Sequence, residues 1–191
     1  MYATVFGGIA LSPLAAQIQL ISGGVSAPAP GSQVSWQQGL AQHSVSPLPL
    51  RILKVTQSYF PFMDRGGPAM KVRAMARGLV LRGHQVTVLT TDLGLRERGE
   101  GLALSCSPWG WRSTTDDVEA IYLRPRNIYR ALTWNPAVHS FSRERVPSFD
   151  LVHIYGLYDL LAPPVASVCR KLGIPYIVEP IGMFRPIVRS I

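Results

Sequence analysis

The chain has 191 residues, a length typical of one domain, or of one domain and a small part of another. It is 47% hydrophobic and 16% charged, which excludes a disordered charged tail and predicts a folded core. The net charge is +8, yet residues 1–50 contain no Lys, Arg, Asp or Glu. Two cysteines, without the spacing of a zinc or redox motif, predict free thiols and a cytoplasmic protein.

Residues 1–50 are expected to form a disordered extension. The apolar stretch 2–21 is interrupted by Pro13 and the Gly7-Gly8 pair, and no basic segment precedes it. It therefore fits neither a membrane-spanning helix nor a signal peptide. Residues 22–50 are rich in Ser, Gly, Pro, Ala and Gln, the composition of a linker. A segment foreign to the working protein and a degenerate membrane anchor are the alternatives.

From residue 51 onward, predicted strands and helices alternate. Residues 51–57 form a short apolar, β-branched run that predicts a strand. A loop containing Gly66-Gly67 follows, and Pro68 suits the first position of a helix that Gly83 ends. Residues 85–91 predict a second strand, and a right-handed crossover makes the two strands parallel neighbours.

The rest of the chain continues this pattern after an interruption. Residues 94–117 show no regular period and predict a long irregular connection. Further strands are predicted at 118–123, 150–155 and 174–179, with one helix within 133–146 and another ending at Leu172-Gly173. The sequence therefore predicts an α/β fold, a doubly wound, Rossmann-like parallel sheet that binds ligands at the carboxyl ends of its strands.

The Gly66-Gly67 pair is a candidate phosphate site at one of these strand ends. Glycines before a helix let the backbone approach a ligand closely and direct free N–H groups at an anion. An ordinary turn is the alternative. The G-x-G-x-x-G spacing is absent, although Asp92 lies where a ribose-binding acid is expected, so an NAD-linked oxidoreductase is disfavoured.

His153 and Glu179 are candidates at the fourth and fifth strand ends. A lone histidine inside a strand is more often a buried, hydrogen-bonded residue than a functional one. Glu179 is more informative, because a carboxylate ending an apolar strand is costly to bury unless it faces a cleft or has a partner. The alternative for Glu179 is an ordinary loop carboxylate.

Several segments together resemble the amino-terminal half of the family 4 glycosyltransferases of GT-B fold. They are LKVTQSYFP at 53–61, Gly66-Gly67, ARGLVLRGHQVTVLTT at 76–91, DLVHIYG at 150–156 and GIPYIVEPIGM at 173–183. The resemblance covers residues 51–191. It implies an incomplete, acceptor-side Rossmann-like domain at 51–191 and says nothing about residues 1–50.

The resemblance implies a transferase that moves a sugar from a UDP- or GDP-linked donor to a saccharide or lipid-linked acceptor. Such enzymes assemble polysaccharides or glycoconjugates at the inner face of a membrane, and a net charge of +8 favours contact with anionic lipid. No metal, other cofactor or nucleic acid is implied, because oriented N–H groups and cations stabilise the departing diphosphate. The implied residues are Gly66 and Gly67 for the donor diphosphate, and His153, Tyr155, Gly156, Glu179 and Gly182 for the acceptor cleft.

Two features depart from the family pattern. The family often has His-x-His at the end of the fourth strand, its second histidine reaching the sugar. Here His153 matches the first histidine and Tyr155 replaces the second, so no catalytic residue is carried over. The chain also ends at Ile191, before a donor-binding domain, so we expect it to be inactive alone. A non-catalytic binding module is the competing class.

Overall fold

The computed structural model describes residues 48–181 except 66, 130–131 and 157–158. The predicted disordered extension therefore lies almost entirely outside the described residues, as do Gly66 and Gly182. No helix of the described part of the chain combines the length and the apolar character needed to cross a bilayer.

Seven strands form one sheet in the order β3-β4-β5-β2-β1-β8-β9. Five of them run parallel, and they are β1 (Arg51–Val55), β2 (Gln85–Thr91), β5 (Val118–Leu123), β8 (Leu151–Tyr155) and β9 (Tyr176–Glu179). Counted along the chain, these parallel strands lie in the order 3-2-1-4-5, which defines the doubly wound α/β fold. The predicted fold class is confirmed.

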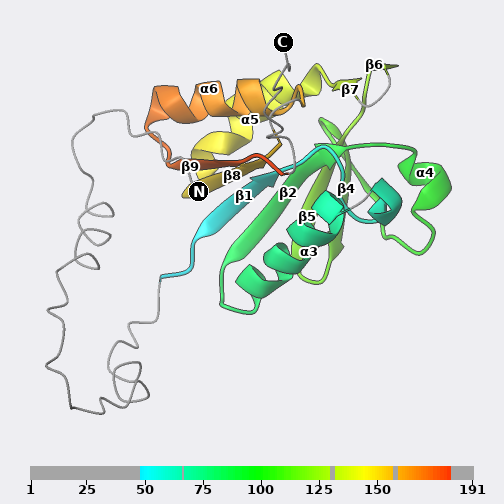
Figure 1. Cartoon of the computed structure of the whole chain (residues 1–191), viewed down its shortest axis with the longest axis horizontal. Helices are drawn as coiled ribbons and strands as arrows, with labels where there is room; N and C mark the ends of the chain where they lie inside the picture. Colours follow the sequence, from blue (N-terminus) through cyan, green and yellow to red (C-terminus); the bar gives the residue numbers. More distant parts are fainter. Residues whose placement is uncertain (1–47, 66, 130–131, 157–158, 182–191) are drawn as a thin grey trace, which may run out of the picture. The chain divides into compact units, whose positions relative to one another are not determined.

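Helices cover both faces of this sheet (Figure 1). The long helices are α3 (Gly67–Val80), α5 (Ala137–Arg145) and α6 (Ala162–Leu172), and the short 3-10 turns are η2 (Met63–Arg65) and η3 (Val146–Ser148). Helix α3 packs on one face, while α5 and α6 pack on the other. The helix predicted to end at Gly173 does so, because Gly173 adopts a left-handed φ of 68° and its N–H donates to the carbonyl oxygen of Cys169.

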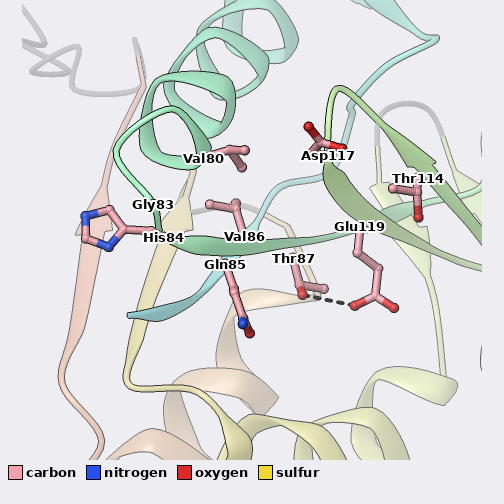
Figure 2. Close-up of a pocket in the computed structure, with 9 residues that line it drawn as sticks. All are labelled: Val80, Gly83, His84, Gln85, Val86, Thr87, Thr114, Asp117 and Glu119. Atoms are coloured by element: carbon pink, nitrogen blue, oxygen red, sulfur yellow. Dashed lines mark hydrogen bonds between the residues drawn. The ribbon is translucent and has the colours of Figure 1, made fainter. Parts of the chain in front are cut away.

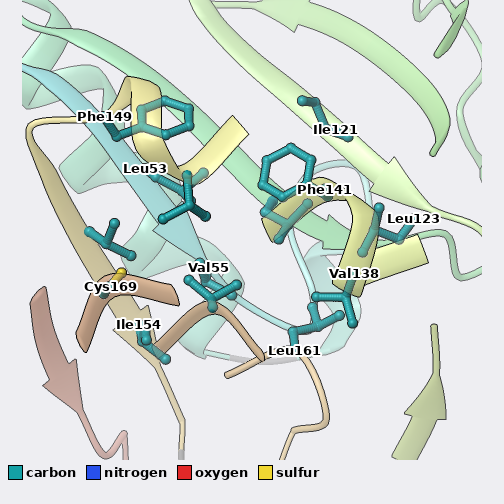
Figure 3. Packing of buried hydrophobic residues seen from close by; sticks show 14 residues of the cluster. Leu53, Val55, Ile121, Leu123, Val138, Phe141, Phe149, Ile154, Leu161 and Cys169 are labelled. Carbon is teal, nitrogen blue, oxygen red and sulfur yellow. The ribbon is translucent and has the colours of Figure 1, made fainter. Parts of the chain in front are cut away.

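The core under α5 and α6 follows from strand alternation (Figure 3). Leu53 and Val55 of β1 point to this face, where Phe141 of α5 and Cys169 of α6 are also fully buried. Each fully buried Leu, Val or Phe side chain contributes about 1.5–3 kcal/mol through removal of apolar surface from water. This core fixes α5 and α6 over β1 and β8.

The core under α3 uses the opposite positions of the same strands. Val86 and Val88 of β2 and Tyr122 of β5 meet Val72 and Ala76 of the helix. The small Ala76 side chain lets α3 lie close to the sheet. The amino terminus of α3 is thereby held beside the end of β1.

The predicted irregular connection at residues 94–117 is wrong. It contains α4 (Leu95–Arg98), β3 (Ser105–Ser107) and β4 (Gly110–Thr115), and β4 pairs antiparallel with β5. These edge strands are short, and the side chain buried by β4 is the polar Ser113, so they lack an apolar alternation. The hairpin of β6 (Asn127–Tyr129) and β7 (Leu132–Trp134) forms a separate sheet and was likewise not predicted.

Candidate functional site

The order in which successive strands are added to the sheet reverses between β1 and β8. These strands are parallel neighbours, with Val55 opposite Ile154. The connection after β1 leads to α3 on one face, and the connection after β8 leads to α6 on the other. Open α/β sheets bind ligands at this position, just beyond the carboxyl ends of the strands.

The connection from β1 to α3 is held by aromatic side chains. Tyr59 and Phe62 are buried in the core under α3. Tyr122 Oη donates a 2.6 Å hydrogen bond to the carbonyl oxygen of Phe60, and Arg73 of α3 lies over the Phe60 ring at 4.1 Å. These anchors define where the chain enters the helix.

Gly67 is the first residue of α3, one of the two glycines predicted to approach a phosphate. A Cβ atom at Gly67 would meet nothing within 4 Å, so the space beside the helix start is open. The first turn of α3 carries no acidic residue. The positive end of the helix is therefore not neutralised by its own side chains.

Lys54 and Tyr155 form a buried polar pair on the α3 face of the sheet. Lys54 is fully buried, and its Nζ donates a 2.6 Å hydrogen bond to Tyr155 Oη. Tyr155 is 2% exposed, and its hydroxyl in turn donates to Met75 Sδ at 3.5 Å. Tyr155 is thus committed to internal contacts.

His153, Glu179 and Lys71 continue this cluster toward the surface. Lys71 Nζ forms an ion pair with Glu179 Oε1, and His153 Nε2 lies 3.2 Å from Glu179 Oε2. The second contact has the distance of an ion pair but not the angle of a hydrogen bond, so the buried His153 Nε2 lacks a hydrogen-bond partner. The His153 ring stacks on the Tyr155 ring with 4.1 Å between centroids.

Burial sets the protonation of this cluster. It lowers the pKa of Lys54 to about 8, while the negative charge of Glu179 opposes the change. Burial also lowers the pKa of His153 to about 4, with the charge of Lys54 acting in the same direction, so the imidazole is neutral at pH 7. The pKa of Tyr155 is raised well above its ordinary value, again chiefly by burial.

The end of β8 is tied both to β9 and to the start of α6. Gly156 has a left-handed φ of 92°, and its N–H donates to the carbonyl oxygen of Glu179 at 2.9 Å. Asp159 Oδ1 accepts the N–H groups of Leu161 and Ala162, at 3.1 and 2.8 Å. Burial nevertheless raises the pKa of Asp159 to about 6.

The structure brings four of the five predicted cleft residues together. His153 touches both Tyr155 and Glu179, and Gly156 bonds to the Glu179 backbone. Lys71, one helical turn beyond Gly67, links this group to the start of α3. The remaining predicted residues, Gly66 and Gly182, lie outside the described part of the chain.

Asp92 has a local structural partner. Its Oδ1 accepts the N–H groups of Gly94 and Leu95, at 3.0 and 2.7 Å, where α4 begins. The carboxylate therefore stabilises the start of a short helix. This contact weakens the alternative in which Asp92 binds a ribose.

Sequence reasoning missed Lys54, Lys71 and Asp159. Lys54 carried a usable signal, because a lysine inside the apolar strand RILKV is costly to bury without partners. Lys71 and Asp159 carried none, since both are ordinary polar residues near a helix start. Within the described residues, no three His, Cys, Asp or Glu side chains gather closely enough to hold a metal ion.

A surface hollow of about 460 Å³ lies at the amino-terminal ends of β2 and β5, the ends of these strands away from the candidate site (Figure 2). It is lined by the end of α3, the start of β2 and the turn between β4 and β5. Glu119 in this hollow accepts a 3.0 Å hydrogen bond from Thr87 and lies within 3.5 Å of Arg112 and Arg145. Its carboxylate is satisfied by these neighbours, and the hollow lies away from the strand ends where ligands of this fold bind.

Comparison with known proteins gives a family match and several distant structural likenesses. The family described as "Glycosyl transferase 4-like domain" matches residues 66–189, which is more than half of the chain. No curated protein sequence matches the chain.

Two solved structures are distantly similar to this chain. The catalytic domain of starch synthase IV from Arabidopsis thaliana, bound to ADP and acarbose, has a TM-score of 0.45 and 14% identity. That likeness covers 68% of this chain and 33% of that chain, so this chain spans about a third of its length. The C-terminal domain of a hydrogenase from Pyrococcus furiosus has a TM-score of 0.36 and 17% identity, over 70% of this chain and 96% of that chain. Likenesses this distant carry no weight for function.

Proposed function

Because the chain belongs to the glycosyl transferase 4-like family, we propose that it forms the acceptor-side half of a sugar transferase. The donor is a nucleotide-sugar, UDP- or GDP-linked, and the acceptor is a saccharide or a lipid-linked saccharide. The observation that carries the proposal is the ion pair between Lys71 and Glu179. It joins the start of α3 to the end of β9, at the edge where this fold binds ligands.

The start of α3 is the proposed seat of the donor diphosphate. Helix α3 has 14 residues, so its amino terminus carries the full partial positive charge of a helix dipole. The open space beside Gly67 and the absence of an acidic side chain in the first turn support an anion there. Lys71 supplies a nearby cation that is half exposed, with 48% of its side-chain surface accessible.

The proposed reaction moves charge toward this end of the helix. An acceptor hydroxyl oxygen bonds to the anomeric carbon, the bond from that carbon to the diphosphate breaks, and the hydroxyl proton passes to a base. The departing diphosphate gains negative charge, which oriented N–H groups and cations stabilise. Within the described cluster, the Glu179 carboxylate and the neutral His153 imidazole are the groups able to accept the proton.

The proposal places the enzyme in the cytoplasm, in contact with the inner face of a membrane. A net charge of +8 supports attraction to anionic lipid headgroups, although a basic surface alone identifies no particular membrane. A non-catalytic module that holds the acceptor is the second candidate, and it shares the same site. Binding of a nucleoside diphosphate separates the two.

The test is a thermal-shift comparison of the chain with UDP, GDP and NAD. At a ligand concentration ten times its dissociation constant, the stabilisation is about 1.4 kcal/mol, or a rise in Tm of about 3 °C. We expect this rise with UDP or GDP. Lys71→Gln should reduce it, while Lys171→Gln, an equal loss of charge on exposed α6 surface, should not. Stabilisation by NAD alone would favour an oxidoreductase, and no shift with any of the three would leave only the binding module.

A further inference from the structure

The β6–β7 hairpin carries exposed apolar side chains on one face. Tyr129 pairs directly with Leu132, and Trp134 follows Leu132 by two residues on the same strand. Side chains two residues apart on a strand share a face. Tyr129 is 69% exposed, Leu132 41% and Trp134 44%.

The hairpin is oriented by a buried polar contact on its other face. Thr133 is 3% exposed, and its hydroxyl lies 3.2 Å from the hydroxyl of Thr91 at the end of β2. Asn135, also buried, donates to both hydroxyls, at 2.9 and 3.3 Å. Because Thr133 is fixed inward, its neighbours Leu132 and Trp134 must point outward.

The surroundings of this face are basic. Arg124 and Arg126, just before β6, are exposed, and neither guanidinium forms an ion pair with any residue that the structure describes. The sequence contains no Asp or Glu from residue 120 to residue 143.

We propose that the outward face of the β6–β7 hairpin docks on an anionic lipid bilayer, with its apolar side chains in the headgroup region. Trp and Tyr favour the boundary between water and hydrocarbon, and flanking arginines attract anionic headgroups. The exposed aliphatic side chain of Leu132 gains free energy only if it leaves water. The two exposed arginines and the absence of Asp and Glu from residues 120–143 make this surface complementary in charge to an anionic bilayer.

The inference gives the membrane contact of the proposed function a defined surface. It identifies the hairpin at the carboxyl end of β2 as the part that meets the lipid (Figure 1). It rests on the proposed function only for the expectation that the protein works at a membrane. Its test needs neither nucleotide nor sugar, so failure of one proposal is distinguishable from failure of the other.

The experiment is co-sedimentation of the full chain with vesicles. One set contains phosphatidylcholine and phosphatidylglycerol, and the other contains phosphatidylcholine alone, each at low and high salt. We expect binding to the anionic vesicles that weakens with salt. The double variant Arg124→Gln/Arg126→Gln should reduce this binding by about fivefold or more. Neither guanidinium has a described partner, so this variant should melt at the wild-type temperature.

Matched controls separate the hairpin from general stickiness and general charge. Arg170→Gln/Lys171→Gln removes the same charge from the last turn of α6 and should leave vesicle binding unchanged. Leu132→Ser/Trp134→Ser should weaken binding even at low salt, whereas Leu81→Ser/Leu172→Ser, at two other exposed leucines, should not. Equal loss in hairpin and control variants, or binding that none of them changes, would overturn the proposal. So would a dimer in solution that Leu132→Ser/Trp134→Ser dissociates, since a second copy would then cover the face.

Discussion

Lys54 Nζ and Tyr155 Oη are joined by a 2.6 Å hydrogen bond between adjacent parallel strands, although they stand 101 residues apart in the chain. Lys54 is fully buried, and this is the one hydrogen bond that its ammonium makes within the described residues. The same Tyr155 ring stacks on His153, which lies beside Glu179. The Tyr155 side chain is therefore part of the internal support of the cluster.

Because of Lys54, the free energy of unfolding should vary with pH in the alkaline range. Its folded-state pKa of about 8 lies below the ordinary value of 10.5, so between these values the unfolded chain binds more protons than the folded one. Stability should therefore rise with pH in this window. From pH 7.5 to 9.5 the gain is about 2 kcal/mol, and urea unfolding of the wild type and Lys54→Met measures it.

The Lys54→Met variant should lack this gain and should be at least as stable as the wild type at pH 7.5, because an apolar side chain replaces a buried charge. Measurements below pH 10 keep tyrosine ionisation out of the comparison. Parallel pH profiles for the two proteins would show that Lys54 is hydrated in solution.

Protonation of His153 should destabilise the folded chain as the pH falls. Its folded-state pKa of about 4 is below the ordinary value of 6.5, so protonation favours the unfolded state as pH falls between them. The full effect is about 3 kcal/mol. Relative to the wild type, His153→Gln should become more stable at pH 4.5 than at pH 6.5. An NMR titration in which the His153 ring protonates near pH 6.5 would contradict this account.

Asp159 should act in the opposite direction over nearly the same range. Its pKa of about 6 is above the ordinary value of 3.8, so the folded chain binds the extra proton and gains stability as pH falls through 6. Asp159→Asn keeps an oxygen for the N–H groups of α6 but cannot titrate. Its stability relative to wild type should therefore rise from pH 4.5 to pH 6.5, by about 2 kcal/mol. Urea unfolding at both pH values tests this. The same change in unfolding free energy between the two pH values in the variant and the wild type would refute it.

Two glycines should respond very differently to a methyl group. At Gly110 of β4, whose φ is 154°, a Cβ would overlap the carbonyl oxygen of Tyr122 on β5, so Gly110→Ala must displace the strand pair. At Gly67 a Cβ meets open space in a helical conformation, and alanine favours a helix. Thermal unfolding should show a loss of about 2 kcal/mol or more for Gly110→Ala and no loss for Gly67→Ala. A destabilised Gly67→Ala variant would contradict the open space beside the start of α3.

The parallel strands could be predicted because each is an apolar run bounded by turn residues. The predicted bounds at 85–91 and 118–123 coincide with β2 and β5. The edge strands β3 and β4 could not be found in this way, because their side chains are largely exposed or polar and their pairing depends on β5. The β6–β7 hairpin is too short to show a period.

The candidate site was partly accessible from the sequence. Glu179 stood out as a carboxylate at the end of an apolar strand, and the structure gives it partners in Lys71 and His153. The bond between Lys54 and Tyr155 could not be foreseen from local pattern, because it exists only when β8 inserts beside β1. That placement is a property of the whole strand order.

The most direct test of the central claim is where a nucleoside diphosphate binds. Titration of the isotope-labelled chain with UDP or GDP to millimolar concentration, followed by backbone amide NMR, detects even weak binding and locates it. The account predicts the largest shifts at the first turn of α3, on the amides of Gly67, Ala69, Met70 and Lys71, with smaller shifts at Gly156. Saturable shifts confined to the hollow beside Gln85 and Glu119, or no saturable shift at all, would contradict it.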